Sequence, residues 1–239
     1  MTGQIQNRQA FIEKISQKLK RSEVPSAIER PQWAYTPQYN VLRDKTQDEL
    51  LEVLQKQCKL INTTCKVTQL ADLQEAVYET IQSYGGGPVI AWQDERVQQY
   101  GLSELFNERL PKEQVTVHIW DPVIGRENIS LAEKANIGIT IAEQTLAESG
   151  TAVLLSHKNH GRTVSFLPEK SIILIPKSTI VPRMTQAAVE IRKRILQGEK
   201  VPSCINFISG PSNSADIEMI LVVGVHGPMC MTYIVIDDL

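Results

Sequence analysis

Three segments of the chain concentrate small and hydroxyl-bearing residues that can hold an anion. They run from Glu148 to Thr151, from Ser209 to Asp216 and from Gly224 to Pro228, and each adjoins an apolar run typical of a strand. Glycine lets backbone N–H groups approach a ligand closely, and hydroxyls add donors, so the pattern suits a phosphate, a carboxylate or a nucleotide. Tight turns alone would also explain each segment. The predicted ligand-binding residues here are Gly150, Thr151, Ser209, Gly210, Ser212 and Gly227.

His226 is the best candidate for proton transfer, because an imidazole titrates near neutral pH. It lies between two glycines of the third segment, and a loop histidine hydrogen-bonded to backbone is the alternative interpretation. Asp216 is a candidate to orient His226 or to bind a ligand hydroxyl. Glu148 is the one candidate nucleophile of the kind that a CoA transferase needs. These three residues are candidates only, and the sequence leaves the catalytic residues unknown.

Arg162 joins the predicted ligand-binding residues, because a guanidinium can grip a carboxylate with two parallel hydrogen bonds. A solvated charge is the alternative. His157 and His160 lie three residues apart, but Gly161 and the loop composition offer no helical face, and no third ligand is evident. The sequence therefore predicts no metal site.

Motifs for the common redox and nucleotide cofactors are missing from the sequence. It contains no GxSxG nucleophile elbow, no GxGxxG dinucleotide pattern and no P-loop. Its four cysteines form no CxxC pair and no iron–sulfur spacing; they are Cys58, Cys65, Cys204 and Cys230. We therefore expect structural thiols and no cofactor bound by this chain, so that electron transfer would depend on other proteins.

Alternating strand and helix patterns must position these segments. Helices are predicted over 44–57 and 71–84, and the second should stop at three consecutive glycines, 85–87. Residues 65–68 predict a short strand, and the apolar runs at 88–92 and 115–120 predict strands buried on both faces of a parallel sheet. This order predicts an α/β layer fold.

Beyond residue 136 the predicted strands become closely spaced. They cover 138–145, 151–156, 171–175, 204–209, 220–225 and 231–236, with one convincing helix over 185–196.

The N-terminal part predicts a helical extension. Apolar residues between Ile5 and Leu19 recur at helical spacing, and their stripe must pack either on the same chain or on another subunit. Three prolines between 22 and 39 favour an extended connector. We expect residues 1–40 to form this helix and connector, and residues 41–239 to form one α/β domain.

Composition limits the partners and the location of the protein. The chain has 239 residues, 42% of them hydrophobic and 22% charged, as in ordinary globular proteins. A formal charge of −2 argues against nucleic acid as the main partner, since phosphate binding usually brings a basic excess. No apolar run approaches the roughly 20 residues of a membrane span, and the N-terminus lacks the apolar core of a secretory signal. We expect a cytoplasmic protein without a membrane partner.

The C-terminal half resembles the LUD domain family over several motifs. They are the strings GITIAEQTLAESGTAVLLS, GRTVSFLPEKSIILI, FISGPSNSADIEMILVVGVHGP and YIVIDDL. Within them, Glu148, Gly150 and Thr151 match the family's E-x-G-T pattern, with Ser149 where many members carry Thr. The LP pair at 167–168 and the SGPS-x-x-AD run at 209–216 also match. The opening TGQIQNRQAFIEKISQKL and the region 33–37 are similar to the C-type branch of the family, so the resemblance covers nearly the whole chain.

This resemblance implies both a fold and a role. The fold would be a Rossmann-like parallel or mixed sheet of the NagB/RpiA/CoA transferase-like type, shared with sugar-phosphate isomerases and formyltetrahydrofolate cyclo-ligases. The role would be that of a subunit supporting oxidation of L-lactate to pyruvate, with the iron–sulfur clusters held by two partners, the A-type and B-type lactate utilization proteins. This chain would itself bind at most a small anionic ligand.

Two other interpretations remain open at this stage. Fold analogy allows a stand-alone enzyme acting on a phosphorylated sugar, a folate or an acyl thioester, although analogy is a weak argument for activity. A regulatory or structural protein with a vestigial pocket is the third.

Overall fold

The computed structural model describes residues 5–24, 29, 31–217 and 219–239, in two compact units, 1–36 and 37–239. In the first unit, α1 (Arg8–Lys18) is the predicted N-terminal helix. The apolar side chains of Phe11, within the helix, and Leu19, directly after it, are exposed. Part of the predicted connector, including Pro25, lies outside the described residues. Residues 31–36 have no regular structure, and the second unit begins with the short 3-10 helix η1 (Pro37–Tyr39).

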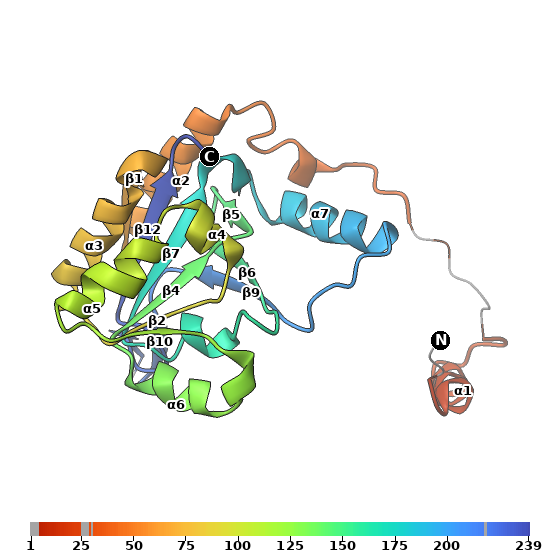
Figure 1. Cartoon of the computed structure of the whole chain (residues 1–239). Coiled ribbons are helices and arrows are strands. Elements are labelled where there is room, and N and C mark those ends of the chain that lie inside the picture. Colours follow the sequence, from red (N-terminus) through yellow and green to blue (C-terminus); the bar gives the residue numbers. More distant parts are fainter. Residues whose placement is uncertain (1–4, 25–28, 30, 218) are drawn as a thin grey trace. The chain divides into compact units, whose positions relative to one another are not determined.

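A six-stranded parallel sheet forms the centre of the second unit (Figure 1). Its strands, in spatial order, are β1 (Thr63–Thr68), β12 (Cys230–Ile236), β7 (Lys170–Pro176), β4 (Ile137–Ile141), β2 (Val89–Ala91) and β3 (Val117–Ile119). The inner strands are rich in Ile, Leu and Val, as expected where both faces of a sheet are covered. The predicted α/β class is confirmed.

Helices cover both faces of this sheet. One face packs against α2 (Gln47–Leu60) and α6 (Glu127–Lys134). The other face packs against α3 (Leu73–Ser83) and the residues from Leu102 to Leu110. Alternation along β7 explains the two cores, because Ile173 faces the first and Ile172 the second. The remaining short elements are η2 (Leu70–Asp72), α4 (Glu95–Gln99), the π-helix η3 (Leu105–Arg109), α5 (Leu110–Lys112), and the 3-10 turns η4 (Pro122–Ile124), η5 (Arg162–Ser165) and η6 (Lys177–Thr179).

Local sequence signals set the ends of the two long helices. Thr46 and Glu49 form a capping box at the start of α2, each side chain bonding the other's backbone N–H. After α3, Gly85 and Gly86 have φ angles of +89° and +80°, which favour glycine. The predicted stop at this position is confirmed.

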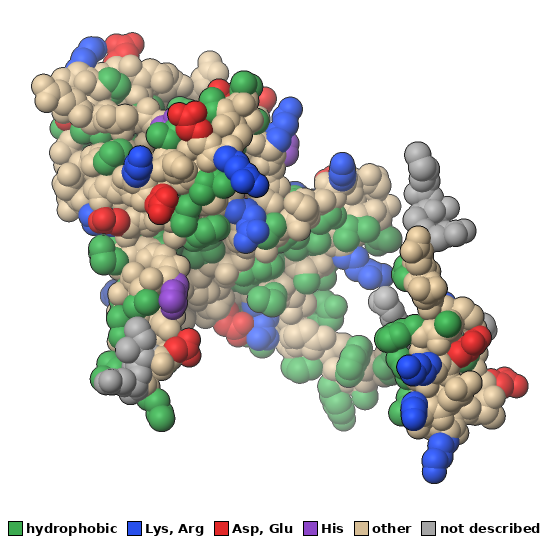
Figure 2. Space-filling view, turned by 90° about the horizontal axis from the view of Figure 1, so that it is seen from below, with side chains coloured by type: hydrophobic (Ala, Val, Ile, Leu, Met, Phe, Trp, Pro, Cys, Tyr) green, Lys and Arg blue, Asp and Glu red, His purple; other side chains and the backbone are tan. Residues whose placement is uncertain are grey.

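A second, four-stranded sheet and a hairpin complete the unit. The sheet order is β8 (Ile180–Val181), β5 (Gln144–Leu146), β6 (Thr151–Leu155) and β9 (Ile205–Ser209), with α7 (Met184–Leu196) packed on it through Ala187. The hairpin joins β10 (Asn213–Ile217) to β11 (Ile220–Val223). Apolar side chains of the hairpin are exposed, among them Leu221. Figure 2 shows hydrophobic side chains on the surface of the protein.

Three predictions about strands are wrong. The expected strand 138–145 is broken at Ala142 and Glu143, because β4 belongs to the central sheet and β5 to the second sheet. The expected loop 209–216 contains β10, which pairs with β11 despite its polar sequence. Strand β3 is half-buried, because it forms an edge of the sheet.

In the part of the chain that the structure describes, every helix is too short or too polar to cross a lipid bilayer.

Candidate functional site

The structure brings together two of the sequence-predicted site residues in a pair of neighbouring strands. Thr151 opens β6 and lies opposite Ser209, the last residue of β9. The Thr151 hydroxyl is 2.6 Å from the Ser209 hydroxyl and 2.6 Å from that of Ser149. Thr151 is buried, so its hydroxyl satisfies its hydrogen bonds inside the protein. Ligand binding by these hydroxyls stays a prediction.

Gly150 and Gly210 pack against Ile61, the residue that directly follows α2. Both have positive φ angles, +64° and +71°. A Cβ added to Gly150 would lie 2.6 Å from Cδ1 of Ile61, and one added to Gly210 would lie 2.4 Å from the Ile61 carbonyl oxygen. The absence of side chains at both positions therefore allows close approach of the protein's own backbone and core.

The other predicted binding residues gather at an open hollow of about 510 Å³ lined by His226, Gly227 and Phe166. Ser212 is close by, because its backbone N–H donates to the Pro228 carbonyl at 2.8 Å. Exposed Arg162 reaches the same area, with its guanidinium carbon 5.9 Å from the centre of the Phe166 ring. The hollow adjoins the amino-terminal ends of β7 and β12, because its lining includes Glu169, which precedes β7, and Met229, which precedes β12. The Met229 N–H donates to the Glu169 carbonyl.

The structure separates Asp216 and Glu148 from His226. Asp216 lies toward the tip of the hairpin, where its carboxylate accepts a hydrogen bond from the Ser214 hydroxyl. His226 lies in the loop that follows the hairpin, three residues after the end of β11 at Val223. Glu148 forms an ion pair with Arg183 at 2.9 Å. Among the described residues, no hydrogen bond or ion pair joins either carboxylate to His226, so the structure does not form the suggested pairing of Asp216 with His226.

A second cluster, not predicted from the sequence, lies at the carboxyl-terminal edge of the central sheet. In open parallel sheets, ligands bind outside the carboxyl ends of strands where the strand order reverses. Here the chain leaves β2 toward the edge strand β3, then returns to β4 and continues to β7. The reversal therefore lies between β2 and β4. Asp94 follows the first of these strands and Glu143 the second.

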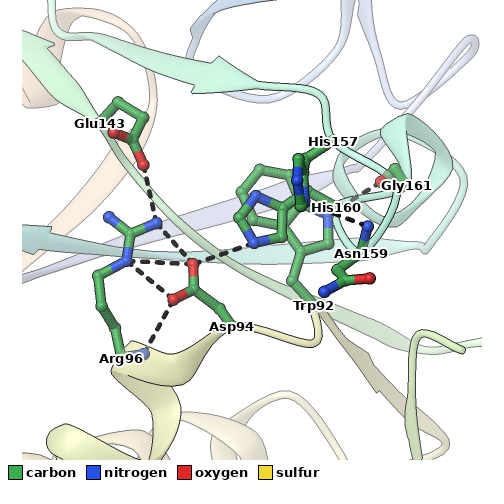
Figure 3. Close-up of polar contacts among 8 residues, drawn as sticks. All are labelled: Trp92, Asp94, Arg96, Glu143, His157, Asn159, His160 and Gly161. Atoms are coloured by element: carbon green, nitrogen blue, oxygen red, sulfur yellow. Dashed lines mark hydrogen bonds and ion pairs between the residues drawn. The ribbon is translucent and has the colours of Figure 1, made fainter. Parts of the chain in front are cut away.

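Asp94 is the centre of this cluster (Figure 3). Its side chain is 6% exposed, and both carboxylate oxygens accept hydrogen bonds from the Arg96 guanidinium, the shortest at 2.6 Å. The same carboxylate caps α4 by accepting from the Arg96 backbone N–H. Arg96 also pairs with Glu143 at 2.8 Å, and so links the ends of β2 and β4.

His160 approaches Asp94 from the loop after β6. Its Nε2 lies 3.2 Å from the Asp94 carboxylate, and its ring stacks on Trp92 with centroids 4.5 Å apart and planes 8° apart. Two indole N–H groups hold the loop, since Trp92 donates to the Gly161 carbonyl and Trp120 to the Lys158 carbonyl. The imidazole is therefore held in position by the surrounding groups (Figure 3).

The electrostatics of the cluster keep Asp94 ionised. Burial opposes ionisation, but the hydrogen bonds from His160 and Arg96 outweigh it and hold the pKa of Asp94 well below its usual value. If His160 donates through Nε2 to Asp94, its Nδ1 carries no proton and can accept a hydrogen bond or a proton. A buried aspartate orients the histidine of a catalytic triad in the same way. The arrangement suits acid–base chemistry or the binding of a ligand hydroxyl.

A hollow of about 270 Å³ adjoins Asp94, on the side of β3. Its lining includes Trp92 and Asn159 from the cluster, together with residues of α4 and η3. Among the described residues, no group of three or more His, Cys, Asp or Glu side chains is arranged to hold a metal ion.

Sequence reasoning missed this site because its members come from distant segments. In the sequence, His160 stands out only through its spacing from His157, and Asp94 belongs to no recognisable motif. One signal was available: Trp92 and Asp94 directly follow a predicted buried strand, where the carboxyl edge of a parallel sheet must lie.

Comparison with known proteins identifies the family. A model of the LUD domain matches residues 45–236. Two proteins named "Lactate utilization protein C", from Geobacillus sp. (strain WCH70) and Geobacillus kaustophilus, are 54% and 56% identical over 99% of this chain and 98% of their own lengths. A protein of the same name from Bacillus subtilis is 49% identical with the same coverage.

A solved structure shares the fold. It is a crystal structure of a DUF162 family protein from Deinococcus radiodurans, with a TM-score of 0.57 and 17% identity over 80% of this chain and 99% of that one. The domain match and the near full-length identity show that the chain belongs to the LUD domain family, in the branch represented by these lactate utilization protein C relatives.

Proposed function

We propose that this protein serves bacterial lactate utilization in the cytoplasm, as a subunit that supports oxidation of L-lactate to pyruvate. The observation that carries this proposal is the 49–56% identity, over 99% of the chain, to relatives named for lactate utilization. Identity of this extent over nearly the whole length favours a shared role more strongly than fold similarity does.

Electron transfer is assigned to partner proteins in this proposal. The cysteine pattern supports the assignment, because the four cysteines are dispersed along the chain and Cys58 lies fully buried in the apolar core. Two iron–sulfur proteins of the A and B types would hold the clusters, and this chain would bind no redox cofactor of its own. Its contribution would be to bind a small ligand or to organise the assembly.

Gene deletion in the native bacterium tests the role. The deletion strain should fail to grow on L-lactate and should grow normally on glucose, and a plasmid copy of the gene should restore growth on lactate. Affinity-tagged protein from lactate-grown cells should copurify with the two iron–sulfur proteins. Normal growth of the deletion strain on L-lactate would overturn the proposed role, and copurification of neither partner would overturn the proposed assembly.

A stand-alone enzyme of the isomerase, CoA transferase or cyclo-ligase type is the second candidate. The oriented Asp94–His160 pair favours it, because such a pair is suited to proton transfer. In the deletion strain, a gene copy carrying His160→Gln should then fail to restore growth on lactate, while a copy carrying His226→Ala succeeds. The candidate is rejected if His160→Gln restores growth fully, because a catalytic imidazole cannot be replaced by an amide.

A further inference from the structure

The hollow beside Asp94 has the position and size of a small-molecule site. It lies at the reversal of strand order, and its volume of about 270 Å³ is just below the usual range for ligand pockets, which begins at about 300 Å³. Six residues define its character: Asp94, Gln98, Ser103, Phe106, Asn107 and Asn159. The volume suits a ligand between a pentose and a nucleoside in size.

The charges around this hollow disfavour an anion. Its lining contains the carboxylates Asp94 and Glu95 and no Lys or Arg side chain. Arg96 lies between the lining residues Glu95 and Val97, but its guanidinium is already bound to Asp94 and Glu143. An anion in an α/β fold commonly sits at the N-terminus of the helix after a strand, but here the Asp94 carboxylate occupies that position as the cap of α4.

The lining of the hollow includes neutral hydrogen-bonding residues and an apolar one. Gln98, Asn107 and Asn159, which carry amides, and Ser103, which carries a hydroxyl, are among the lining residues. Within the described part of the chain, the amide groups of Gln98 and Asn107 make no hydrogen bond to another protein group and are exposed. Buried Phe106 supplies the apolar surface. Amides and hydroxyls both donate and accept hydrogen bonds, as do the hydroxyls of a sugar.

We propose that this hollow binds a neutral, hydroxyl-rich ligand, a pentose or a nucleoside, and that it discriminates against carboxylates and phosphates. The amides of Gln98 and Asn107 bond the ligand hydroxyls, and the carboxylates of Asp94 and Glu95 repel anions. The proposal concerns a ligand of this chain alone and does not depend on the role in lactate utilization.

Binding measurements on the purified full-length chain test the proposal. Ribose, adenosine, L-lactate and inorganic phosphate are titrated separately by calorimetry, up to about 10 mM, so that a Kd of about 1 mM is detected. The variant Gln98→Leu/Asn107→Leu removes two amides. Its matched control is Gln99→Leu, which changes an exposed residue of the same helix α4 outside the hollow and keeps a similar side-chain size and helix propensity.

We expect ribose or adenosine to bind the wild type and the Gln99→Leu variant alike. Loss of two hydrogen bonds should weaken that binding in the double variant by about tenfold or more, while circular dichroism shows the same fold. The proposal is overturned if neither neutral compound binds, if the double variant binds as tightly as the control, or if L-lactate or phosphate competes for the same site. Growth on lactate is a separate readout, so this result leaves the proposed role to its own test.

Discussion

Replacing Asp94 with Ala should destabilise the second unit by about 2–4 kcal/mol. Loss of a helix cap typically costs about 1 kcal/mol. Breaking a buried ion pair costs about 3–5 kcal/mol. The cost for the Asp94–Arg96 pair should be smaller, because the Arg96 side chain is 23% exposed and keeps its ion pair with Glu143 at 2.8 Å. Stability is measured by urea unfolding at neutral pH, followed by circular dichroism.

Asp121→Ala is the matched control for this measurement. Asp121 follows β3 as Asp94 follows β2, and its carboxylate caps the next turn by accepting from the Val123 N–H at 2.9 Å. Among the described residues, no cation lies within 4.0 Å of Asp121, so its replacement should cost only about 1 kcal/mol. If Asp94→Ala were no more destabilising than Asp121→Ala, the ion pairs assigned to Asp94 would contribute nothing to stability and the reasoning would be refuted.

The stability difference between the wild type and Asp94→Ala should depend on pH in a direction that the pKa of Asp94 fixes. The pKa of Asp94 in the folded protein is below its ordinary value of 3.8, so below that pH the unfolded chain takes up a proton that the folded chain does not. The stabilisation from Asp94 should therefore be fully present at neutral pH and decline as the pH falls below 3.8. The difference in unfolding free energy between wild type and Asp94→Ala should shrink over this range. A difference that grows with acidification would contradict the assigned direction.

Three further predictions test packing and domain organisation. Gly210→Ala should lower the free energy of unfolding by about 1–3 kcal/mol more than Gly198→Ala, as measured by urea unfolding. Both glycines have a positive φ, but only Gly210 has neighbours in the space that a Cβ would occupy. Equal losses of stability in the two variants would contradict the packing role of Gly210. Tyr233→Phe should cost about 1–2 kcal/mol, because the buried hydroxyl bonds two carbonyls, and an unchanged urea midpoint would rule this out. Chymotrypsin should cut first after exposed Trp33 or Tyr35, because residues 31–36 have no regular structure, and mass spectrometry identifies the fragments; first cuts beyond residue 45 would contradict this prediction.

Sequence patterns located most elements of the fold, because they depend on near neighbours in the chain. The capping residues of α2 and the glycines after α3 are local signals, and the apolar run that forms β7 is long enough to be recognised alone. The polar strand β10 could not be found in this way, because its partner β11 supplies the backbone hydrogen bonds that make it a strand.

The candidate site was less predictable than the fold. Thr151 and Ser209 were recognised as unusual residues, but only strand pairing shows that their hydroxyls bond each other. From the sequence, Gly210 could allow either a ligand or a neighbouring backbone to approach closely. In the structure the Ile61 backbone lies against Gly210, so the glycine allows close packing within the protein.

Periodicity and contiguous motifs in the sequence were enough to predict the α/β class, the main helices and strands and the resemblance to the LUD domain family. The meeting of Asp94, Arg96, Glu143 and His160 at one edge of the sheet is visible only in the three-dimensional fold. Their meeting depends on strand order, because β2 and β4 become neighbours only when β3 takes the outer position. Contacts between residues far apart in the chain follow from this topology, and the sequence near each residue carries no record of it.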